Sequence, residues 1–316
     1  MKLAFILDPL GAIKTYKDTS FAIMEEAARR SHQLFVMQQE QLLCRDGVVR
    51  AIAAPMQLTG EKTSWYTLGE HTEVSLSAFD AVIMRKDPPF DMEYVYSTYL
   101  LELAEAQGAR VINRARALRD NNEKFSITRF PQFTVPMLVT RLESEIRAFL
   151  EAQGDIVLKP LDGMGGASVF RLHSKDHNIG VVIETLTHYG RRTVMAQRFI
   201  PEILKGDKRI ILIDGKPAPY ALARIPKPGE TRGNLAAGGR GVAQPLSARD
   251  REIGEAVGAT LAAEGLLLVG LDVIGDYLTE INVTSPTGMR EIVEQSGCNV
   301  AAMMIDAVER CVDAGR

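Results

Sequence analysis

The sequence has few cysteines and no long apolar run, and each shortage excludes a class of protein. The three cysteines, Cys44, Cys298 and Cys311, are far apart, and no C-x-x-C pair occurs. This number and spacing exclude a disulfide framework and a cysteine-ligated zinc site, and they are typical of a reducing compartment. The first apolar run ends at Asp8, too early for a signal peptide. Since no run approaches the roughly 20 residues that span a membrane, we expect a cytoplasmic protein without membrane segments.

The net charge and the histidines also lack the patterns that mark nucleic-acid binding and histidine-ligated metal sites. The 37 basic and 40 acidic residues give a formal net charge of −3, which argues against a dedicated nucleic-acid binder. The five histidines are scattered, no H-E-x-x-H motif occurs, and no serine or cysteine stands in a recognisable nucleophile setting. The remaining composition, 46% hydrophobic and 24% charged, is that of an ordinary globular protein. With 316 residues the chain is long enough for several domains.

The first third of the chain alternates strand-like and helical patterns. KLAFIL (2–7) and DAVIMRK (80–86) predict buried strands, and SFAIMEEAARR and EYVYSTYLLELAEAQG predict helices. Such alternation predicts a doubly wound parallel sheet in an N-terminal α/β domain over residues 1–121. The stretch 44–78 has no clear pattern and stays unassigned. In LRDNNEK, Asp120 and Glu123 are spaced as a helix-capping pair.

The rest of the chain has the pattern of an α+β fold. Strand-like runs follow one another closely, with short turns that predict antiparallel pairing: DIVLKPL, ASVFRL, TVMAQRFI, KRIILIDG and KPAPYALARI. The glycine-rich stretch 226–241 predicts a mobile loop. Helices are expected near 247–264 and 298–312, with a strand pair between them. We place a boundary near residue 199, which separates a central unit (122–199) from a C-terminal unit (200–316).

The stretch KPLDGMGGASVF (159–170) combines a lysine with three glycines but matches neither common nucleotide motif. Lys159 precedes the glycines, whereas a Walker loop has its lysine after them, and Ser168 stands where the last glycine of a dinucleotide fingerprint belongs. Because strand-like runs flank the loop, we expect the tip of a hairpin, which could fold over a nucleotide or serve only as a tight turn. Lys159 itself interrupts an apolar strand, so it either meets an anionic partner or protects a sheet edge.

The segment GLDVIGDYLTEINVTSPTGMRE (270–291) carries three oxygen donors on a predicted hairpin. Glu280 and Asn282 share a face of one strand, and Asp272 lies on the preceding strand. Such donors suit Mg²⁺, which takes a few protein oxygens together with phosphate oxygens and water. A simple two-residue turn would place Asp272 on the face opposite Glu280, so a shared face requires an odd loop or a bulge. The alternative is a solvent-facing polar edge.

Arginines stand at strand ends and in the glycine-rich stretch. Arg85 follows the strand AVIM, where the carboxyl end of a parallel strand meets the ligand crevice. Arg209 and Arg224 stand at strand ends, and Arg232 and Arg240 lie in the stretch 226–241. Because guanidinium groups bind carboxylates and phosphates through paired hydrogen bonds, the set predicts a polyanionic substrate together with ATP.

These segments resemble the ATP-grasp ligases and, within them, the bacterial glutathione synthetase family. The resemblance covers almost the whole chain and rests on segments that occur in the family's order: MRKDPPFD, NEK, VLKPLDGMGGAS, MAQ, GDKR, ARIP, ETRGNLAAGGRG, VGLD and TEINVTSPTG. It implies a Rossmann-like N-terminal domain, a central lid and a C-terminal domain, with ATP held between two antiparallel sheets. The combination of ETRGNLAAGGRG with TEINVTSPT is the most specific feature.

The resemblance also implies roles for individual residues. It implies an ATP-binding set of Lys124, Lys159, Asp162, Gly163, Met164, Gly165, Gly166, Gln197, Arg198, Phe199 and Asp207. It implies substrate binding by Arg85, Arg209, Arg224, Arg232, Asn234, Ser285 and Thr287, and catalytic roles for Lys159, Arg209 and Arg232. The implied metal ligands are Asp272, Glu280 and Asn282.

The implied activity is the ATP-dependent ligation of γ-glutamylcysteine and glycine through an acyl phosphate. The implied cofactors are ATP and Mg²⁺, with Mn²⁺ as the alternative cation, and the implied assembly is a homo-oligomer, a tetramer or a dimer. Two other interpretations stay open at this point. One is an ATP-grasp peptide ligase with a different amine acceptor, and the other is a nucleotide-binding regulator without catalysis.

Overall fold

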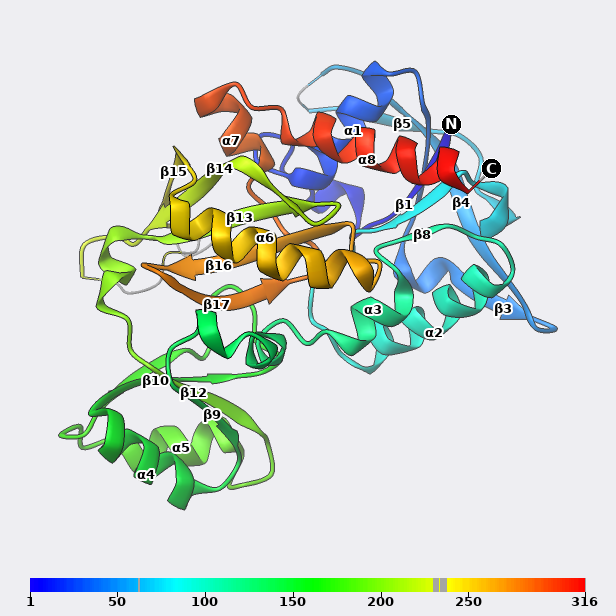
Figure 1. Cartoon of the computed structure of the whole chain (residues 1–316). Coiled ribbons are helices and arrows are strands. Elements are labelled where there is room, and N and C mark those ends of the chain that lie inside the picture. The colour runs from blue at the N-terminus through cyan, green and yellow to red at the C-terminus, as the bar shows by residue number, and fades with distance from the viewer. Residues whose placement is uncertain (62, 230–232, 234–237, 316) are drawn as a thin grey trace.

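The computed structural model describes residues 1–61, 63–229, 233 and 238–315, and these residues form three sheets with helices packed on them (Figure 1). A mixed sheet belongs to the N-terminal part, a four-stranded antiparallel sheet to the middle, and a five-stranded antiparallel sheet to the C-terminal part. In Figure 1 the four-stranded sheet, in green, stands apart from the body formed by the other two sheets. The prediction of two antiparallel sheets after an α/β domain is confirmed.

The N-terminal sheet has a parallel core, as predicted. The parallel strands are β1 (Lys2–Ile6), β2 (Gln33–Met37), β7 (Ala81–Met84) and β8 (Val111–Ile112). The unassigned stretch continues this sheet with antiparallel strands: β3 (Leu42–Arg45), β4 (Val48–Leu58), β5 (Tyr66–Leu68) and β6 (Thr72–Ser75). The sequence did not predict these strands, because Pro55 lies inside β4 and because β5 and β6 are short and polar. The sheet is therefore mixed rather than wholly parallel.

Helices on both faces make this sheet doubly wound. Leu3 and Phe5 of β1 belong to the core that includes α1 (Thr19–Arg29), whereas Ala4 and Ile6 belong to the core on the α2 (Met92–Ala106) side. Aspartate side chains cap both helices: Asp18 accepts from the Phe21 amide at 2.8 Å, and Asp91 from the Tyr94 amide at 3.0 Å. The short α3 (Ala115–Asp120) then leads to the next sheet.

The central sheet has the order β11-β10-β12-β9 and carries its helices on one face. Its strands are β9 (Met137–Thr140), β10 (Asp155–Pro160), β11 (Phe170–His173) and β12 (Val194–Arg198), and its helices are α4 (Glu143–Gln153) and α5 (Ile179–Thr187). The expectation of a short turn between the runs ASVFRL and TVMAQRFI was wrong, because α5 joins them. Ile156 and Leu158 pack against the helices in one apolar cluster, so the alternation of β10 points Lys159 to the other face.

The C-terminal sheet has the order β15-β14-β13-β16-β17. Its strands are β13 (Asp207–Ile213), β14 (Lys216–Ile225), β15 (Arg240–Pro245), β16 (Leu268–Ile274) and β17 (Tyr277–Asn282), and its helices are α6 (Ala248–Ala263), α7 (Met289–Ser296) and α8 (Val300–Ala314). Short 3-10 helices lie at Leu10–Ala12, Gln39–Gln41, Leu76–Ala78, Phe125–Arg129, Pro131–Phe133 and Pro201–Lys205. Among the helices that the structure describes, none has both the length and the apolar character needed to span a bilayer.

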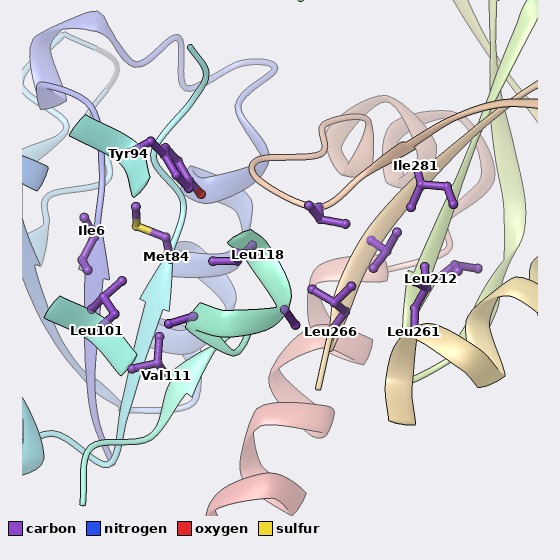
Figure 2. Close-up of a cluster of buried hydrophobic side chains, with 14 of the residues drawn as sticks. Ile6, Met84, Tyr94, Leu101, Val111, Leu118, Leu212, Leu261, Leu266 and Ile281 are labelled. Atoms are coloured by element: carbon purple, nitrogen blue, oxygen red, sulfur yellow. The ribbon is translucent and has the colours of Figure 1, made fainter. Parts of the chain in front are cut away.

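One apolar cluster joins the N-terminal and C-terminal sheets. Figure 2 shows a row of buried side chains that begins with Ile6, Met84, Tyr94, Leu101 and Val111, continues through Leu118 and Leu266, and ends with Leu212, Leu261 and Ile281. Asn113 adds polar contacts across the same junction, since its amide nitrogen donates to the Leu268 carbonyl at 2.7 Å and its oxygen accepts from the Leu268 amide at 2.8 Å. Shared apolar burial and these buried hydrogen bonds fix the two units relative to each other.

Glu26 connects α1 to α8 and makes the stability of the protein depend on acid pH. Its buried carboxylate accepts from Arg29 at 2.9 Å and from Arg30 at 2.8 Å, and Arg30 also pairs with Asp306 of α8 at 2.6 Å. The hydrogen bonds from Arg29 and then Arg30 lower the pKa of Glu26 from 4.5 to about 2. A carboxyl group with a lowered folded-state pKa stabilises the fold above its unfolded pKa, and this stabilisation is lost as the pH falls from about 4.5 through about 2.

We expect Glu26→Gln to lower the free energy of unfolding by about 2 kcal/mol at neutral pH, with a smaller loss as the solution becomes more acidic. Urea unfolding followed by the fluorescence of Trp65 measures this, because this single tryptophan packs on Phe21 of α1 with ring centroids 5.1 Å apart. Glu25→Gln is the matched control, since the Glu25 side chain is 57% exposed in its pair with Arg290. Equal losses in the two variants would contradict the prediction.

Candidate active site

The hairpin of β16 and β17 brings the predicted metal ligands to one face. Its turn is the two-residue Gly275–Asp276, with Ile274 paired to Tyr277, and a bulge follows between Asp272 and Val273. The bulge places Asp272 directly opposite Glu280, and Asn282 stands two residues farther along β17. A shared face thus arises through a bulge, which was one of the two routes that the sequence left open.

Strand register adds two arginines and a further aspartate to this face. Arg209 pairs with Asp272 across β13 and β16, and Asp207 pairs with Arg224 across β13 and β14. Arg209 donates to Asp272 through Nε at 2.5 Å and Nη2 at 3.1 Å, and Arg224 reaches the same carboxylate at 2.8 Å. The face therefore holds an alternating arrangement of buried carboxylates and guanidinium groups.

Charges within the arrangement determine how its carboxylates titrate. Burial opposes ionisation of Asp272, but Arg209 and Arg224 hold its pKa well below the ordinary value. Burial raises the pKa of Asp207, against the opposing effect of Arg224. One oxygen of Asp207 and Nε of Arg224 lie buried without a hydrogen-bond partner among the described residues. Because unpaired buried polar groups are costly, these atoms are candidates to contact a bound ligand.

Two buried lysines approach the same hairpin from other elements. Lys124 donates to Glu280 at 2.8 Å and to the carbonyl of Gly163 in the glycine loop. Burial opposes its charge, but Glu280 raises the pKa of Lys124 above its ordinary value. Lys159, only 7% exposed, donates to the Thr279 carbonyl at 3.2 Å, and burial lowers its pKa to about 8. Lys159 is therefore not an edge lysine in solvent, because it lies between the central and C-terminal sheets.

The glycine loop forms the tip of the β10–β11 hairpin, as predicted. The two strands pair antiparallel from Asp155 with His173 to Leu158 with Phe170. Gly165 and Gly166 adopt φ values of 63° and 77°, which favour glycine. Lys124 contacts both Gly163 of the loop and Glu280 of the β16–β17 hairpin, so the loop lies beside this hairpin.

A cavity of about 150 Å³ lies between the central and C-terminal sheets. Apolar walls come from Val157, Phe199, Ile200 and Ile274, and the guanidinium of Arg171 stacks 3.7 Å from the centre of the Phe199 ring. Most of the residues predicted to bind ATP line it: Lys124, Lys159, Gly163, Gly165, Gly166, Gln197, Arg198, Phe199 and Asp207. Asp162 instead pairs with Arg192, and Met164 lines a neighbouring cavity. An apolar slot with basic groups at one end suits a nucleotide base and its phosphates.

A second cavity of about 390 Å³ adjoins the first one. The two cavities share the walls Gly165, Asp272 and Glu280. Among the predicted substrate residues, the second cavity is lined by Arg209, Arg224, Ser285 and Thr287. Arg85 is buried behind this region, where it donates to the Ser20 hydroxyl at 2.9 Å and to the Pro286 carbonyl at 3.0 Å. Because Asp272 and Glu280 line both cavities, a ligand in the first cavity and a ligand in the second could meet at the β16–β17 hairpin.

Part of the stretch 226–241 falls outside the described residues, and so do the predicted substrate residues Arg232 and Asn234. Gly233 is described and lines the first cavity. A Cβ atom at Gly233 would lie 2.3 Å from the Arg224 carbonyl oxygen, so only glycine fits this close approach.

The donor set of the hairpin fits a hard divalent cation. Asp272, Glu280 and Asn282 offer two carboxylates and one amide, and Mg²⁺ takes a few such oxygens together with phosphate oxygens and water. In the part of the chain that the structure describes, no three or more His, Cys, Asp or Glu side chains are grouped so as to hold a metal ion by themselves. The site thus suits a cation that arrives with a phosphate ligand.

Comparison with known proteins assigns the chain to a family. Residues 1–119 match the family model for the N-terminal domain of prokaryotic glutathione synthetase, and residues 123–297 match the model for its ATP-grasp domain. The chain belongs to the prokaryotic glutathione synthetase family. It is therefore an ATP-dependent ligase of the ATP-grasp type.

Relatives in this glutathione synthetase family match over almost their full length. The glutathione synthetase of Nitrosomonas europaea is 65% identical over 313 residues, which cover 98% of each chain. That of Ralstonia nicotianae is 58% identical over 310 residues, covering 98% of this chain and 96% of the relative. Among solved structures, D-cycloserine synthetase DcsG matches with a TM-score of 0.69 over 99% of this chain and 100% of its own. At 16% identity, this last likeness shows the fold alone.

Sequence reasoning missed several charged residues of this glutathione synthetase site. The predicted capping role of Glu123 was wrong: its half-buried carboxylate accepts from the Val283 and Thr284 amides at 3.0 and 3.2 Å. Other unpredicted residues line the second cavity, namely Lys14, Lys17, Asp18, Asp87 and Glu291. Arg85 was predicted because it stands just after a parallel strand. The same rule, applied to the loop after β1, would have predicted Lys14 and Lys17.

Proposed function

We propose that this ligase joins γ-glutamylcysteine to glycine at the expense of ATP and so produces glutathione, ADP and phosphate. The observation that carries the proposal is the wall that the two cavities share at Gly165, Asp272 and Glu280. A nucleotide in the first cavity and a peptide carboxylate in the second would meet at this wall. Family membership and relatives named glutathione synthetase support this choice of substrates.

The first step transfers the γ-phosphoryl group of ATP to the cysteinyl carboxylate of γ-glutamylcysteine. A carboxylate oxygen forms the new bond to phosphorus while the bond to the ADP oxygen breaks, which gives an acyl phosphate. Lys159 and Arg209 would stabilise the charge on the transferring group, because both are buried cations beside the shared wall. A divalent cation held by Asp272, Glu280 and Asn282 would neutralise phosphate charge when bound.

The second step forms the peptide bond. The amine of glycine attacks the acyl carbon, phosphate leaves, and the amine loses a proton. Arg224, whose Nε has no hydrogen-bond partner among the described residues, lines the cavity in which the substrates would lie. We assign Arg209, Arg224, Ser285 and Thr287 to substrate binding. Arg85 keeps its expected substrate role as part of the proposal: it supports the Pro286 backbone through Nη2, and its Nη1 has no hydrogen-bond partner among the described residues. Arg232 and Asn234 keep their expected substrate roles as part of the proposal, with Arg232 acting on the reacting groups.

The basic and acidic side chains of the site pair with one another. Asp272 pairs with Arg209 and Arg224, and Lys124 pairs with Glu280. Phosphate and carboxylate groups of the substrates would replace the carboxylates as partners of the basic side chains. The carboxylates would then be free to take the metal, so substrate and metal binding would support each other.

Mg²⁺ is the expected cation, with Mn²⁺ as the alternative, and the cytoplasmic location and homo-oligomeric assembly also stay predictions. We assign residues 1–121 to the N-terminal domain, 122–199 to the lid and 200–316 to the C-terminal domain.

An assay of ADP release against a panel of acceptors and amines tests the proposal. We expect ADP and tripeptide in equal amounts only when γ-glutamylcysteine and glycine are both present. Equal turnover without γ-glutamylcysteine would point to a ligase of different substrates. Binding of ATP without any ADP release would point to a regulator.

A further inference from the structure

Helix α2 carries apolar side chains on two faces, and only one of these faces packs against the rest of the chain. The inward face is buried and consists of Tyr94, Ser97, Thr98, Leu101 and Ala104. The outward face presents four large apolar side chains that are 40% to 56% exposed: Met92, Tyr96, Tyr99 and Leu103. Among the described residues, no other helix exposes more than one large apolar side chain. A helix that is apolar all round is normally covered on all sides, so the outward face of α2 lacks its cover.

The exposed residues of α2 have the spacing of a seam between two helices. Together with the exposed Ala106, they stand four, three, four and three residues apart along the helix. This alternation is the heptad pattern with which one α-helix packs along another. The acids Glu93 and Glu102 flank the stripe on its two sides and do not interrupt it. The pattern therefore fits a partner that offers a helix with a matching apolar seam.

The stripe is symmetric about Tyr99, so it matches its own copy. Tyr96 and Leu103 stand three and four residues to either side of Tyr99, and Met92 and Ala106 stand seven to either side. In an antiparallel pair of α2 helices centred on Tyr99, Tyr96 would therefore face Leu103 of the partner subunit. A two-fold dimer uses one such self-complementary surface on both of its chains.

The central residue of the stripe is already held in position. The guanidinium group of Arg119 stacks on Tyr99, 4.7 Å from the centre of the ring, and Glu102 accepts from Arg119 at 2.6 Å. A ring that is fixed before association loses little freedom when a second copy packs on it. Tyrosine and arginine are also the side chains that contribute most at the centres of protein interfaces.

The area of the stripe is that of an interface core. A half-exposed tyrosine or methionine presents roughly 100 Å², so the four large side chains present about 400 Å² on each chain. A stable interface of standard size covers about 800 Å² on each partner, with an apolar core and a polar rim. The stripe supplies about half of that area as the core, and Glu93, Glu102 and Arg119 beside it supply polar groups for the rim.

We propose that α2 is a dimerisation surface, on which a second copy of this chain packs its own α2 antiparallel about a two-fold axis at Tyr99. No residue of α2, which the structure describes throughout, lines either of the two cavities of the active site. Pairing through α2 therefore involves no wall residue of these cavities. It is also independent of which substrates the enzyme joins.

Sedimentation velocity of the full-length protein tests this surface with charges placed at the facing positions. The variants are Tyr96→Glu, Leu103→Lys and the combination of the two. Val181→Glu is the matched control, because Val181 is a 64% exposed apolar residue on a different helix, α5. Trp65 fluorescence during urea unfolding shows whether each variant is folded.

We expect the wild type to sediment as a dimer or as a multiple of one. Each single variant should raise the dissociation constant of the α2 pair at least about a hundredfold and halve the observed mass, because a buried charge without a partner opposes association. The double variant should recover at least about tenfold of that loss, since each new glutamate then faces a new lysine of the other copy. Val181→Glu should sediment like the wild type.

A wild type that sediments as a single chain at every concentration would overturn the proposal, and so would single variants that keep the wild-type mass. Equal dissociation of Val181→Glu would show that the loss is not specific to α2 and would also overturn it. Dissociation of both single variants without recovery in the double variant would exclude the antiparallel pairing. Because none of these outcomes depends on turnover, they are distinguishable from a failure of the proposed function.

Discussion

Replacing Lys159 with methionine is expected to lower kcat by about a hundredfold to a thousandfold, because one preorganised donor to the transferring phosphoryl group is removed. Lys159 is 7% exposed, and its ammonium bonds only to the Thr279 carbonyl among the described residues. Methionine has a similar length but no charge, so the substitution removes a buried cation without opening a large cavity. We therefore expect the free energy of unfolding not to fall below that of the wild type, because the buried charge of Lys159 itself opposes folding.

Steady-state kinetics and urea unfolding measure the two effects separately. Lys175→Met is the matched control, because Lys175 is an exposed lysine of the same lid. Near-normal turnover in Lys159→Met would contradict a phosphate role for this lysine. Loss of activity together with a loss of several kcal/mol in stability would instead indicate a structural role.

The pH dependence of nucleotide binding gives an independent readout of the same residue. Burial lowers the pKa of Lys159 from 10.5 to about 8 in the unliganded protein. Nucleotide affinity should therefore weaken as the pH rises above about 8, by up to tenfold per pH unit. The unliganded fold should gain stability over the same interval, because the unfolded lysine stays protonated up to about 10.5 and the buried charge opposes folding. Lys159→Met should lack both trends.

Glu280→Gln is the second substitution with a large expected effect. The Glu280 carboxylate stands opposite Asp272 across the hairpin, and its side chain is 22% exposed in its pair with Lys124. Removing one of two carboxylate donors should weaken divalent-cation binding about a hundredfold, because Mg²⁺ and Mn²⁺ favour charged oxygen ligands. Direct binding of Mn²⁺ in the presence of ADP, followed by electron paramagnetic resonance, measures this without turnover.

Glu280→Asp serves as the matched variant, since it keeps the charge and shortens the side chain. Its cation affinity should lie between those of the wild type and Glu280→Gln. Unchanged affinity in Glu280→Gln would count against metal ligation by this residue. The pair Lys124–Glu280 would then serve only to fix the glycine loop.

Local patterns predicted the elements that carry the site, but not every group in it. The alternation of β10 placed Lys159 on one face and Ile156 and Leu158 on the other, because a period of two is fixed by strand geometry. The bulge that brings Asp272 opposite Glu280 was predicted only as one of two ways in which these residues could share a face. A bulge depends on how the paired strand and the sheets beyond it pack, which a single hairpin sequence does not specify.

Residues from loops and helix starts were the hardest to predict. Lys17 and Glu291 meet at one cavity only because α1 packs against α7, a contact between the two ends of the chain. Glu123 fits a local capping pattern, yet it bonds to the backbone of Val283 and Thr284. In each case a contact with a distant part of the chain decides where the side chain lies, and the neighbouring residues in the sequence do not specify that contact.

The central claim is that the cysteinyl carboxylate is phosphorylated at the wall shared by the two cavities. The most direct test uses γ-glutamylcysteine with ¹⁸O in that carboxylate, together with ATP and glycine. If an acyl phosphate forms and glycine displaces phosphate from it, one ¹⁸O atom must appear in each inorganic phosphate released. If the label stays entirely in the tripeptide, the carboxylate was never phosphorylated and the account is wrong.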